Sequence, residues 1–418
     1  MTSDPQCIAD SETERFRGFN LHTAFQPVFS LTHGRLVGHE ALLRATDFTG
    51  APVPPPQVFA SLRDNAERAE LDFLAVRQHL KAYRSAGKFS EPEWLLLNVH
   101  PASLITVGGS LALIEQAIVD SGIRPSRVVI EVLESPLVGS DQIVDALKRL
   151  RALGCLIALD DFGAGHSNFE RVFDMQPHIV KLDRKVLVRA KADPKARRIL
   201  QRMVSLIQEC GSLVLMEGVE TLEGAHITLT CDADLVQGYY FGTPQPHALG
   251  SGHPCNELRE AWNTFDERQS RLDDRWREAM AHHCDRLQLA SISLAAGGGM
   301  PESCAAFLRA PEATMCYLLD ENGQQLDAIA FRDDAHRRDL GGVEQFEPLR
   351  DCIGARWSRR QYFRRAVSFP GATQLTRPYL TLQGGWMCLT ASIAFELDGR
   401  IAVLCGDLRA GPMAFETP

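Results

Sequence analysis

The sequence lacks three features that would each assign it to a particular class of protein. It has no apolar run of about 18 residues, and its start, MTSDPQCIADSETER, is polar and acidic, so neither a membrane span nor an export signal is expected. It has no basic excess, because 44 Lys and Arg face 53 Asp and Glu. A formal charge of −9 argues against wrapping duplex nucleic acid. We therefore expect a cytoplasmic protein whose partners include neither a membrane nor duplex nucleic acid.

Paired cysteines are also missing, although cysteine itself is not. The 11 cysteines are scattered along the chain and form no CxxC pair of the kind that zinc sites use. Free cysteine is among the residue types most often buried. Most of these thiols are therefore expected to be small core residues, with a redox or metal role as the less common alternative.

What the sequence does contain is typical of a globular protein with two domains. Its 418 residues exceed the length of one ordinary domain, and 45% hydrophobic with 23% charged residues is close to the soluble average. Between Phe25 and Tyr240, short apolar runs alternate with segments of helical period. After the hairpin-like FQPVFSLTHGRLVGHEALLR, the runs are WLLLN, VVIE, LIALDD, HIVK, LVLME and DLVQ. SDQIVDALKRLRALG and DPKARRILQRMVSLIQECG are predicted to be amphipathic helices. This order predicts an α/β fold.

Each of the apolar runs ends in a polar residue. In a barrel of parallel strands, the C-terminal strand ends meet on one face, where active sites are built. One polar residue at a strand end usually only marks where the strand meets water, but seven such ends in succession are not explained in that way. The residues at these ends are Glu40, Asn98, Glu131, Asp160 with Asp161, Lys181, Glu217 and Gln237.

Five carboxylates among these residues predict bound cations. Without positive charge they would repel one another and their pKa values would rise. Oxygen ligands suit hard divalent ions such as Mg²⁺, Mn²⁺ or Ca²⁺. Five carboxylates favour two ions with a shared carboxylate, the arrangement used for in-line attack on phosphate esters. Lys181 is either a structural ion-pair partner or a group that orients the nucleophile and stabilises charge developing on phosphate.

These motifs together resemble the EAL domain family over about residues 20–250. The resemblance is carried by HEALLR (His39 to Arg44), FQPVF, LLLNVHP, VVIEVLES, LDDFGAGHSNF, HIVKLD, LMEGVET and VQGYYFGTP. It implies a TIM-like (β/α) barrel with an antiparallel first strand. It also implies hydrolysis of the bacterial second messenger cyclic di-GMP to linear pGpG, with two Mg²⁺ or Mn²⁺ ions per site and Ca²⁺ as an inhibitor.

The resemblance further implies a role for each residue. Glu40, Asn98, Glu131 and Asp160 would hold one ion, Asp160 and Asp161 the second, and Glu217 the water on the second ion's side. Lys181 would assist the attacking water, Gln237 would lie at the edge of the site, and Gln26 and Arg44 would contact guanine and phosphate. A regulatory loop linking metal binding to a dimer interface would comprise Glu134, Phe162, Gly163, Gly165, His166, Ser167 and Asn168. Gly163 and Gly165 are expected to allow its sharp turn.

Three positions depart from the family's pattern, and none is a proposed ligand. His100 replaces a common serine, Leu133 a common threonine, and His166 a usual tyrosine. Leu133 and His166 lie close to the regulatory loop. They therefore put the coupling through that loop, or the basal rate of hydrolysis, in doubt more than the presence of the metal site. The main alternative is a receptor that binds cyclic di-GMP without hydrolysis and relays occupancy to a partner. The third hypothesis is a phosphatase or nuclease on a similar barrel.

The C-terminal third is predicted to be a helical linker, residues 251–299, followed by a small α+β domain, residues 300–418. Before it, an N-terminal tail, residues 1–19, precedes the barrel domain, residues 20–250. A stripe of Trp262, Phe265, Leu272, Trp276 and Met280 favours core packing over a dimerising coiled coil, because its spacing is not a clean heptad. His282 and His283 are expected to be solvated. Turns at Glu321-Asn322-Gly323 and Asp398-Gly399 predict antiparallel hairpins.

The small domain resembles PAS or Cache-like sensory domains through CYLLDENGQQ, RWSRRQYFRRA, RPYLTL and CLTASIAFELDGRIAVLCGDL. The resemblance implies a small-molecule pocket lined by Trp357, Arg360, Tyr362 and Asp407. A docking or dimerisation module whose aromatic residues are simply core is the alternative. A homodimer is expected in either case.

Overall fold

The computed structural model describes residues 13–87, 92–105, 110–134, 140–165, 169–250, 253, 255–333, 352–381 and 386–411. The chain forms two compact units, Met1–Phe265 and Asp266–Pro418, which are described separately. No helix in the described part of the chain is both long enough and apolar enough to cross a bilayer.

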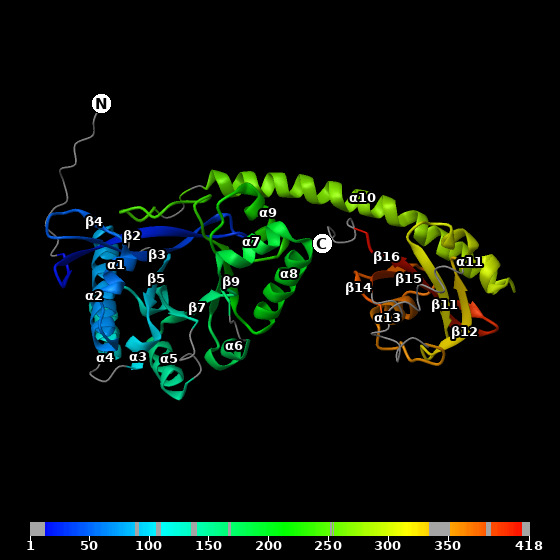
Figure 1. The fold of residues 1–418 in the computed structure, drawn as a ribbon, viewed down its shortest axis with the longest axis horizontal. Helices are drawn as coiled ribbons and strands as arrows, with labels where there is room; N and C mark the ends of the chain where they lie inside the picture. Colours follow the sequence, from blue (N-terminus) through cyan, green and yellow to red (C-terminus); the bar gives the residue numbers. More distant parts are fainter. Residues whose placement is uncertain are drawn as a thin grey trace, which may run out of the picture. The chain divides into compact units, whose positions relative to one another are not determined.

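The first unit contains a closed barrel of eight strands among its described residues (Figure 1). Following the ring, each strand pairs with the next, and β3 closes the circle on β2. β2 is antiparallel to both of its neighbours, and the other barrel strands run parallel to one another. The ring is β2 (Phe19–Ser30), β10 (Leu235–Val236), β9 (Leu213–Met216), β8 (Ile179–Leu182), β7 (Leu156–Phe162), β6 (Val128–Leu133), β5 (Trp94–Val99) and β3 (Arg35–Thr46). The predicted TIM-like barrel with an antiparallel first strand is confirmed.

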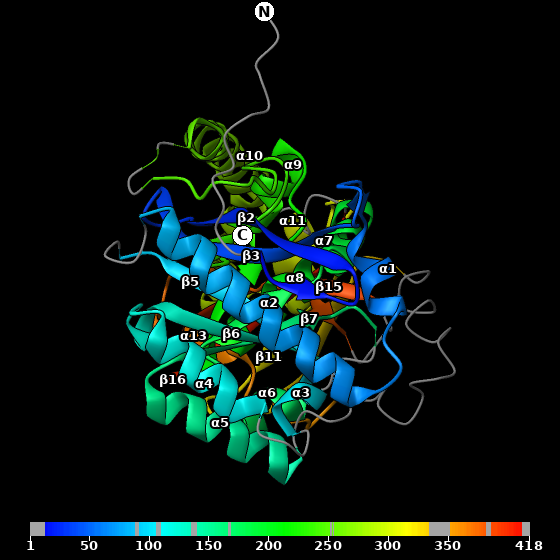
Figure 2. The same ribbon diagram turned by 90° about the vertical axis from the view of Figure 1, so that its left-hand side faces the viewer.

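Helices follow the parallel strands and cover the outside of the barrel. In Figure 2, α2, α4 and α5 lie side by side, as their contacts also show. The helices of this unit are α1 (Pro55–Ala60), α2 (Asn65–Ser85), α3 (Pro101–Ile105), α4 (Ser110–Asp120), α5 (Asp141–Leu153), α6 (Phe169–Met175), α7 (Arg184–Ala192), α8 (Pro194–Glu209) and α9 (Leu222–Thr230). Short strands β1 (Arg15–Phe16) and β4 (Pro52–Val53) pair with β2 and β3.

The two helices predicted from periodicity are present, and their burial follows the predicted faces. α5 buries Ile143, Ala146, Leu147 and Leu150, which share one helical face. It ends at Gly154, whose φ of 105° is readily adopted only without a side chain. In the same way, α8 buries Leu200, Val204 and Ile207.

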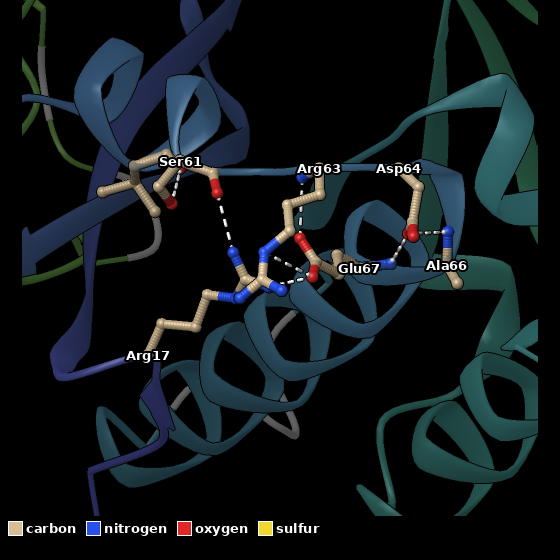
Figure 3. Close-up of polar contacts among 7 residues, drawn as sticks. Arg17, Ser61, Arg63, Asp64, Ala66 and Glu67 are labelled. Atoms are coloured by element: carbon tan, nitrogen blue, oxygen red, sulfur yellow. Dashed lines mark hydrogen bonds and ion pairs between the residues drawn. The ribbon is translucent and has the colours of Figure 1, made fainter.

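The start of α2 is held by a network of local hydrogen bonds (Figure 3). Asp64 caps the helix by accepting hydrogen bonds from the backbone N–H groups of Ala66 and Glu67, each at 2.9 Å. Glu67 in turn accepts a hydrogen bond from the Arg63 N–H at 2.7 Å and pairs with Arg17. Arg17 also donates to the Ser61 carbonyl at 2.7 Å. The network ties the turn before β2 to the helix that follows β3.

The barrel interior explains why polar strand ends converge. The cluster inside the barrel takes one apolar residue from each of seven strands: Val28, Leu96, Val129, Ala158, Ile179, Leu215 and Leu235. Alternate residues of a strand point to the same face. Asn98, Glu131, Asp160, Lys181, Glu217 and Gln237 each come two positions after one of these interior residues. They therefore point inward at the C-terminal mouth of the barrel.

The second unit is a smaller α+β structure with an antiparallel sheet, as predicted. Its sheet order is β12-β11-β16-β15-β13, with β14 also paired to β15. Both predicted hairpin turns occur, and Gly323 and Gly399 have φ of 75° and 77°. The strands are β11 (Ala313–Leu319), β12 (Gln325–Phe331), β13 (Gln374–Leu375), β14 (Tyr379–Leu380), β15 (Met387–Leu397) and β16 (Arg400–Arg409), with helices α11 (Met300–Leu308) and α13 (Gln361–Ser368).

A single helix of 40 residues, α10 (Asn256–Ala295), lies where the helical linker is predicted. Trp262 and Phe265 pack on the core of the first unit, and Trp276 and Met280 pack on that of the second. The stripe therefore includes core residues of both units. The exact domain boundaries stay a prediction, because the contact division falls inside α10. The expectation for His283 is wrong: its ring lies against Phe307 and is only 7% exposed.

Candidate active site

The predicted strand-end residues come together around the ammonium group of Lys181. Its Nζ lies 2.8 Å from Glu131 Oε1, 2.8 Å from Glu217 Oε1 and 3.1 Å from Asp160 Oδ1. Glu40 Oε1 is 3.6 Å away. Four carboxylates from four strands thus surround one lysine that is 1% exposed.

Glu40 is fixed by amide groups as well as by charge. Asn98 Nδ2 donates to its Oε1 at 2.8 Å, and Gln237 Nε2 donates to its Oε2 at 2.7 Å. The carboxylate therefore bridges the end of β5 and the end of β10. Gln237 belongs to the site itself rather than to its edge, because it is 3% exposed and contacts Glu40 directly.

A second cluster of oxygen atoms lies beside the lysine. Asp160, Asp161 and Glu217 each offer a carboxylate oxygen, and these atoms all lie within 4.8 Å of one another. Asp161 has a φ of 59°, which residues other than glycine seldom adopt. Its N–H is held by Asp160 Oδ1 at 2.9 Å. This backbone conformation allows two successive carboxylates to reach one site, whereas successive residues of a regular strand face opposite ways.

The charges of the site oppose and compensate one another. Burial works against ionisation of Glu40, but Lys181 and the amides of Asn98 and Gln237 outweigh it and hold the pKa of Glu40 below its usual value. Burial raises the pKa of Glu131 well above its usual value, and burial followed by the charge of Asp160 raises that of Asp161. Burial also raises the pKa of Glu217. One ammonium group is therefore too little positive charge for this set of acids.

The residues present fit divalent cations, because such ions would supply the positive charge that this set of acids lacks. Glu131 Oε2 and Gln237 Oε1 are buried and accept no hydrogen bond from the described residues. Carboxylate and amide oxygens are the ligands that Mg²⁺, Mn²⁺ and Ca²⁺ prefer. The groups that would hold such ions are the carboxylates of Glu40, Glu131, Asp160, Asp161 and Glu217 with the amide oxygen of Asn98.

The predicted regulatory loop lies partly within the described residues. Glu134 pairs with Arg171 at 2.8 Å, and its N–H donates to the Asp160 carbonyl at 3.0 Å. The Phe162 ring is buried against Phe169. These contacts join the end of β6, the end of β7 and helix α6. His166, Ser167 and Asn168 lie outside the described residues.

The two loop glycines differ in what they require. Gly163 has a φ of 95°, and a Cβ there would lie 2.3 Å from Val186 Cγ2. Gly165 has no such φ, and a Cβ there would meet no atom of the described residues within 4 Å. The expected need for glycine is therefore confirmed at Gly163, whereas at Gly165 neither the backbone conformation nor crowding by the described residues demands it.

The predicted substrate contacts lie beside the acids. Gln26 is opposite Glu40 in the β2–β3 register, and its Nε2 donates to the Gly242 carbonyl at 3.2 Å. Arg44 and Asn98 line a cavity of about 240 Å³. His79, Arg68 and Phe59 line the same cavity, and the Arg68 guanidinium carbon lies 4.5 Å from the Phe59 ring centroid. The site thus opens into a pocket with cationic and aromatic walls.

Two polar residues of α2 in this region were not predicted from the sequence. Asp72 accepts hydrogen bonds from the His100 N–H at 2.9 Å and from Ser103 Oγ at 2.6 Å, which fixes the chain after β5. His79 is 3% exposed, its Nδ1 lies 2.8 Å from Thr23 Oγ1, and burial lowers its pKa to about 3. Their place on the buried face of α2, at helical spacing with Leu71, Ala75, Val76, Leu80 and Tyr83, was the signal available.

In the second unit, the predicted pocket residues gather around Tyr379. The Tyr362 and Tyr379 rings stack with centroids 6.2 Å apart. Arg360 lies over the rings of Trp357 and Tyr379. Asp407 is buried and accepts a hydrogen bond from Thr390 Oγ1 at 2.7 Å, and this oxygen lies 2.5 Å from the Tyr379 hydroxyl. The four predicted residues therefore form one connected cluster.

Comparison with known proteins identifies the family of the barrel. The sequence model of EAL domains matches residues 11–244, more than half of the chain. The cyclic di-GMP phosphodiesterase RocR of Pseudomonas aeruginosa is 31% identical over 227 residues, 53% of this chain and 57% of that protein. The oxygen sensor protein DosP of Escherichia coli is 27% identical over 235 residues, 54% of this chain and 28% of that protein.

A solved structure covers both units. The Bacillus subtilis YkuI protein, which has an EAL domain and was solved with cyclic di-GMP and calcium, superposes with a TM-score of 0.75. The match covers 94% of this chain and 96% of that one at 20% identity, so it supports the fold alone. The chain spans less than two thirds of the two curated relatives described above. The barrel fold, its ring of strand-end acids and the matched sequence agree, and the chain belongs to the EAL domain family.

Proposed function

We propose that the protein is a metal-dependent phosphodiesterase that hydrolyses cyclic di-GMP to linear pGpG. The observation that carries this proposal is the arrangement of Glu40, Glu131, Asp160 and Glu217 around Lys181, with the Asn98 amide beside them. The relative that is 31% identical is named as a cyclic di-GMP phosphodiesterase, which supports the substrate.

The metal would be two Mg²⁺ or Mn²⁺ ions, with Ca²⁺ as an inhibitor. Such ions, when bound, polarise a phosphate oxygen and lower the pKa of water. The carboxylates of Glu40, Glu131, Asp160 and Asp161 with the Asn98 oxygen would hold them, and Glu217 would orient the attacking water. The number of oxygen atoms and the single compensating lysine support this assignment.

The other residues of the site would position the substrate and stabilise charge. Lys181 Nζ, held among the acids, would stabilise negative charge that develops on phosphate during in-line attack. Arg44 would contact a phosphate of the dinucleotide, and Gln26 would contact guanine. The cavity of about 240 Å³ beside Asn98 would accept one base against Phe59 and Arg68. A pocket that holds a base in this way would fix the scissile bond relative to the acids.

The second unit would regulate this activity as a PAS or Cache-like sensory domain, and the chain would act as a homodimer. Contacts of Glu134 with both Arg171 and the Asp160 backbone support a link between the metal ligands and the surface of α6. The cluster of Trp357, Arg360, Tyr362 and Asp407 supports a ligand site.

The test is hydrolysis of cyclic di-GMP by the full chain in Mg²⁺ and in Mn²⁺. The Glu40→Ala variant should lose more than about a hundredfold in rate, because a ligand and the partner of Lys181 are removed together. Glu223→Ala, an exposed acid of α9, is the matched control and should retain the rate. Normal turnover by Glu40→Ala would contradict the metal assignment.

The principal alternative is a receptor that binds cyclic di-GMP without hydrolysis. Leu133, which ends β6 next to Glu134 where the family commonly has threonine, is the observation that favours it. Binding measured in Ca²⁺ separates the two functions. Tight binding in Ca²⁺ without turnover in Mg²⁺ or Mn²⁺ would replace the enzyme with the receptor, and cleavage of unrelated phosphate esters at a similar rate would favour a general phosphatase or nuclease.

A further inference from the structure

The chain that follows β10 crosses back over the hairpin that carries Glu40. β10 is only two residues long, and it pairs with the last two residues of β2. Nearer the start of β2, Gln245 takes over this pairing. The Phe25 N–H donates to the Gln245 carbonyl at 2.6 Å, and the Gln245 N–H donates back at 2.9 Å. Residues 242–249, here called the strap, therefore continue the closure of the barrel beyond its last strand.

The strap lies close against β2 at its first residue. A Cβ on Gly242 would lie 2.6 Å from Pro27 Cγ, so the absence of a side chain lets the backbone approach this closely. The Gly242 carbonyl accepts a hydrogen bond from Gln26 Nε2 at 3.2 Å. Gln26 is buried and lies opposite Glu40 in the β2–β3 register. The strap thus fixes an amide that stands beside the acids of the site.

The other end of the strap is held by His39. The Leu249 N–H donates to His39 Nε2 at 3.0 Å. A backbone N–H can only donate, so this ring nitrogen is the acceptor and the proton of the neutral ring is on Nδ1. The ring is fully buried, and its centroid lies 6.2 Å from that of Phe25 and 6.1 Å from that of Tyr83. Packing against two buried aromatic rings fixes the direction in which the imidazole faces.

His39 is the neighbour of Glu40 in β3 but points to the opposite face. Successive residues of a strand alternate, so Glu40 reaches into the barrel while the His39 ring lies outside, against α2. Glu40 is held by two amides and by the Lys181 ammonium group, and none of these three groups belongs to the strap. Opening of the strap would therefore leave Glu40 in place and release the amide of Gln26.

We propose that His39 is a positioning residue that holds the strap on the barrel and thereby orients Gln26 toward the substrate. The inference rests on the proposed function, in which Gln26 contacts guanine, and it adds a residue outside the site that sets the affinity for the dinucleotide. The chain beyond the strap has an attachment of its own, because Trp262 Nε1 of α10 donates to the Leu31 carbonyl at 2.9 Å. The strap can therefore open without detaching α10.

The first experiment compares kinetics of full-chain variants. His39→Phe keeps a ring among the aromatic side chains and removes the acceptor. KM for cyclic di-GMP in Mg²⁺ and Kd in Ca²⁺ should both rise about fivefold to tenfold, with kcat within about twofold of wild type. His39→Gln places an amide oxygen near the position of Nε2 and should restore KM to within about twofold. His33→Phe, at an exposed histidine of the β2–β3 turn, is the matched control and should keep the wild-type constants. A fall in kcat at unchanged KM, or an equal rise in KM for the Phe and Gln variants, would overturn the proposal.

Hydrogen exchange of the strap gives a readout that needs no substrate. In His39→Phe, the N–H groups of the strap should exchange about tenfold faster than in wild type, and His39→Gln should reverse this change. Gly242→Ala tests the strap from its other end, because the added Cβ would press on Pro27; KM and exchange should rise in the same way with His39 intact. Unchanged exchange of the strap in both His39→Phe and Gly242→Ala would overturn the proposal. Faster exchange in these variants, when wild type neither binds nor cleaves cyclic di-GMP, would confirm that His39 holds the strap and contradict the proposed function.

Discussion

The two units treat buried charge in opposite ways. At the mouth of the barrel, Lys181 compensates Glu40, Glu131, Asp160 and Glu217 from within hydrogen-bonding or ion-pairing distance. In the second unit, Asp407 is equally buried, but hydroxyl and thiol groups take the place of a cation. The comparison shows that an acid kept charged for ligand binding needs a fixed cation nearby, whereas an isolated buried acid is kept neutral by its surroundings.

The largest effect is expected from removing the cation of the barrel. Lys181→Met should lower the free energy of unfolding by roughly 3–5 kcal/mol in a chelator, because several buried acids then lack compensation. Mg²⁺ should restore part of that loss, since it supplies positive charge to the same oxygens. The measurement is urea denaturation of the full chain with chelator and with Mg²⁺.

Lys195→Met is the matched control for this comparison, because Lys195 is an exposed lysine at the start of α8. It should leave the unfolding free energy within about 0.5 kcal/mol of wild type. If Lys181→Met behaves like Lys195→Met in chelator, the lysine does not compensate the acids.

The next largest effect is expected from the pH dependence of stability that Asp407, the buried acid of the second unit, causes. Burial raises the pKa of Asp407 from 3.8 to about 7, against the weaker opposing effect of hydrogen bonds from Thr390 and Cys388. Because the folded pKa is higher, the unfolded chain loses the Asp407 proton at a lower pH than the folded chain does. The neutral carboxyl therefore contributes its full stabilisation below about pH 4, and this contribution is lost as the pH rises to about 7. The loss is at most roughly 4 kcal/mol for about three pKa units.

Asp407→Asn mimics the neutral form and should remove this pH dependence. Relative to the variant, wild type should be less stable at pH 8 than at pH 5 in urea denaturation. Asp327→Asn, at an exposed position of β12, should keep the wild-type dependence. The ionisable groups beside Asp407 include Tyr317, Tyr362, Tyr379, Cys316, Cys388 and Cys405, and none of these carries positive charge. Parallel pH curves for wild type and Asp407→Asn would show that the carboxyl does not titrate in this range.

The smallest effect concerns the backbone beside the barrel site. Gly163→Ala should cost about 1–3 kcal/mol in unfolding free energy, because a side chain at φ of 95° is strained and would press on Val186. Gly165→Ala, two residues later, should change stability by no more than about 0.5 kcal/mol. Thermal denaturation of both variants checks the difference. Equal losses would mean that the turn constrains both glycines alike.

The site could be predicted from the sequence wherever local periodicity determines direction. Glu131 and Asp160 each follow an interior residue by two positions, so an alternating strand places them on the inner face. The hairpin turns before Gly323 and Gly399 were predictable for the same reason, since a turn is set by its own few residues.

Contacts between distant elements were not predictable in this way. His283 looked like a solvated member of a charged helix, but α11 brings Phe307 against it. Gln325 Oε1 accepts a hydrogen bond from Trp357, which lies 32 positions later in the chain. The position of Gln237 in the site, rather than at its edge, depends on a hydrogen bond to Glu40 across 197 positions.

The sequence by itself determined the order of strands and helices, the inward direction of the strand-end acids and the family to which the barrel belongs. These follow from the period of two along a strand, the period of 3.6 along a helix and the spacing of motifs. Only the tertiary structure decided which charges meet. Lys181 gained its four acids, and Arg360 has no acidic partner among the residues that the structure describes, because the closing of a barrel and the pairing of distant strands, and not neighbours in the chain, decide which charges meet.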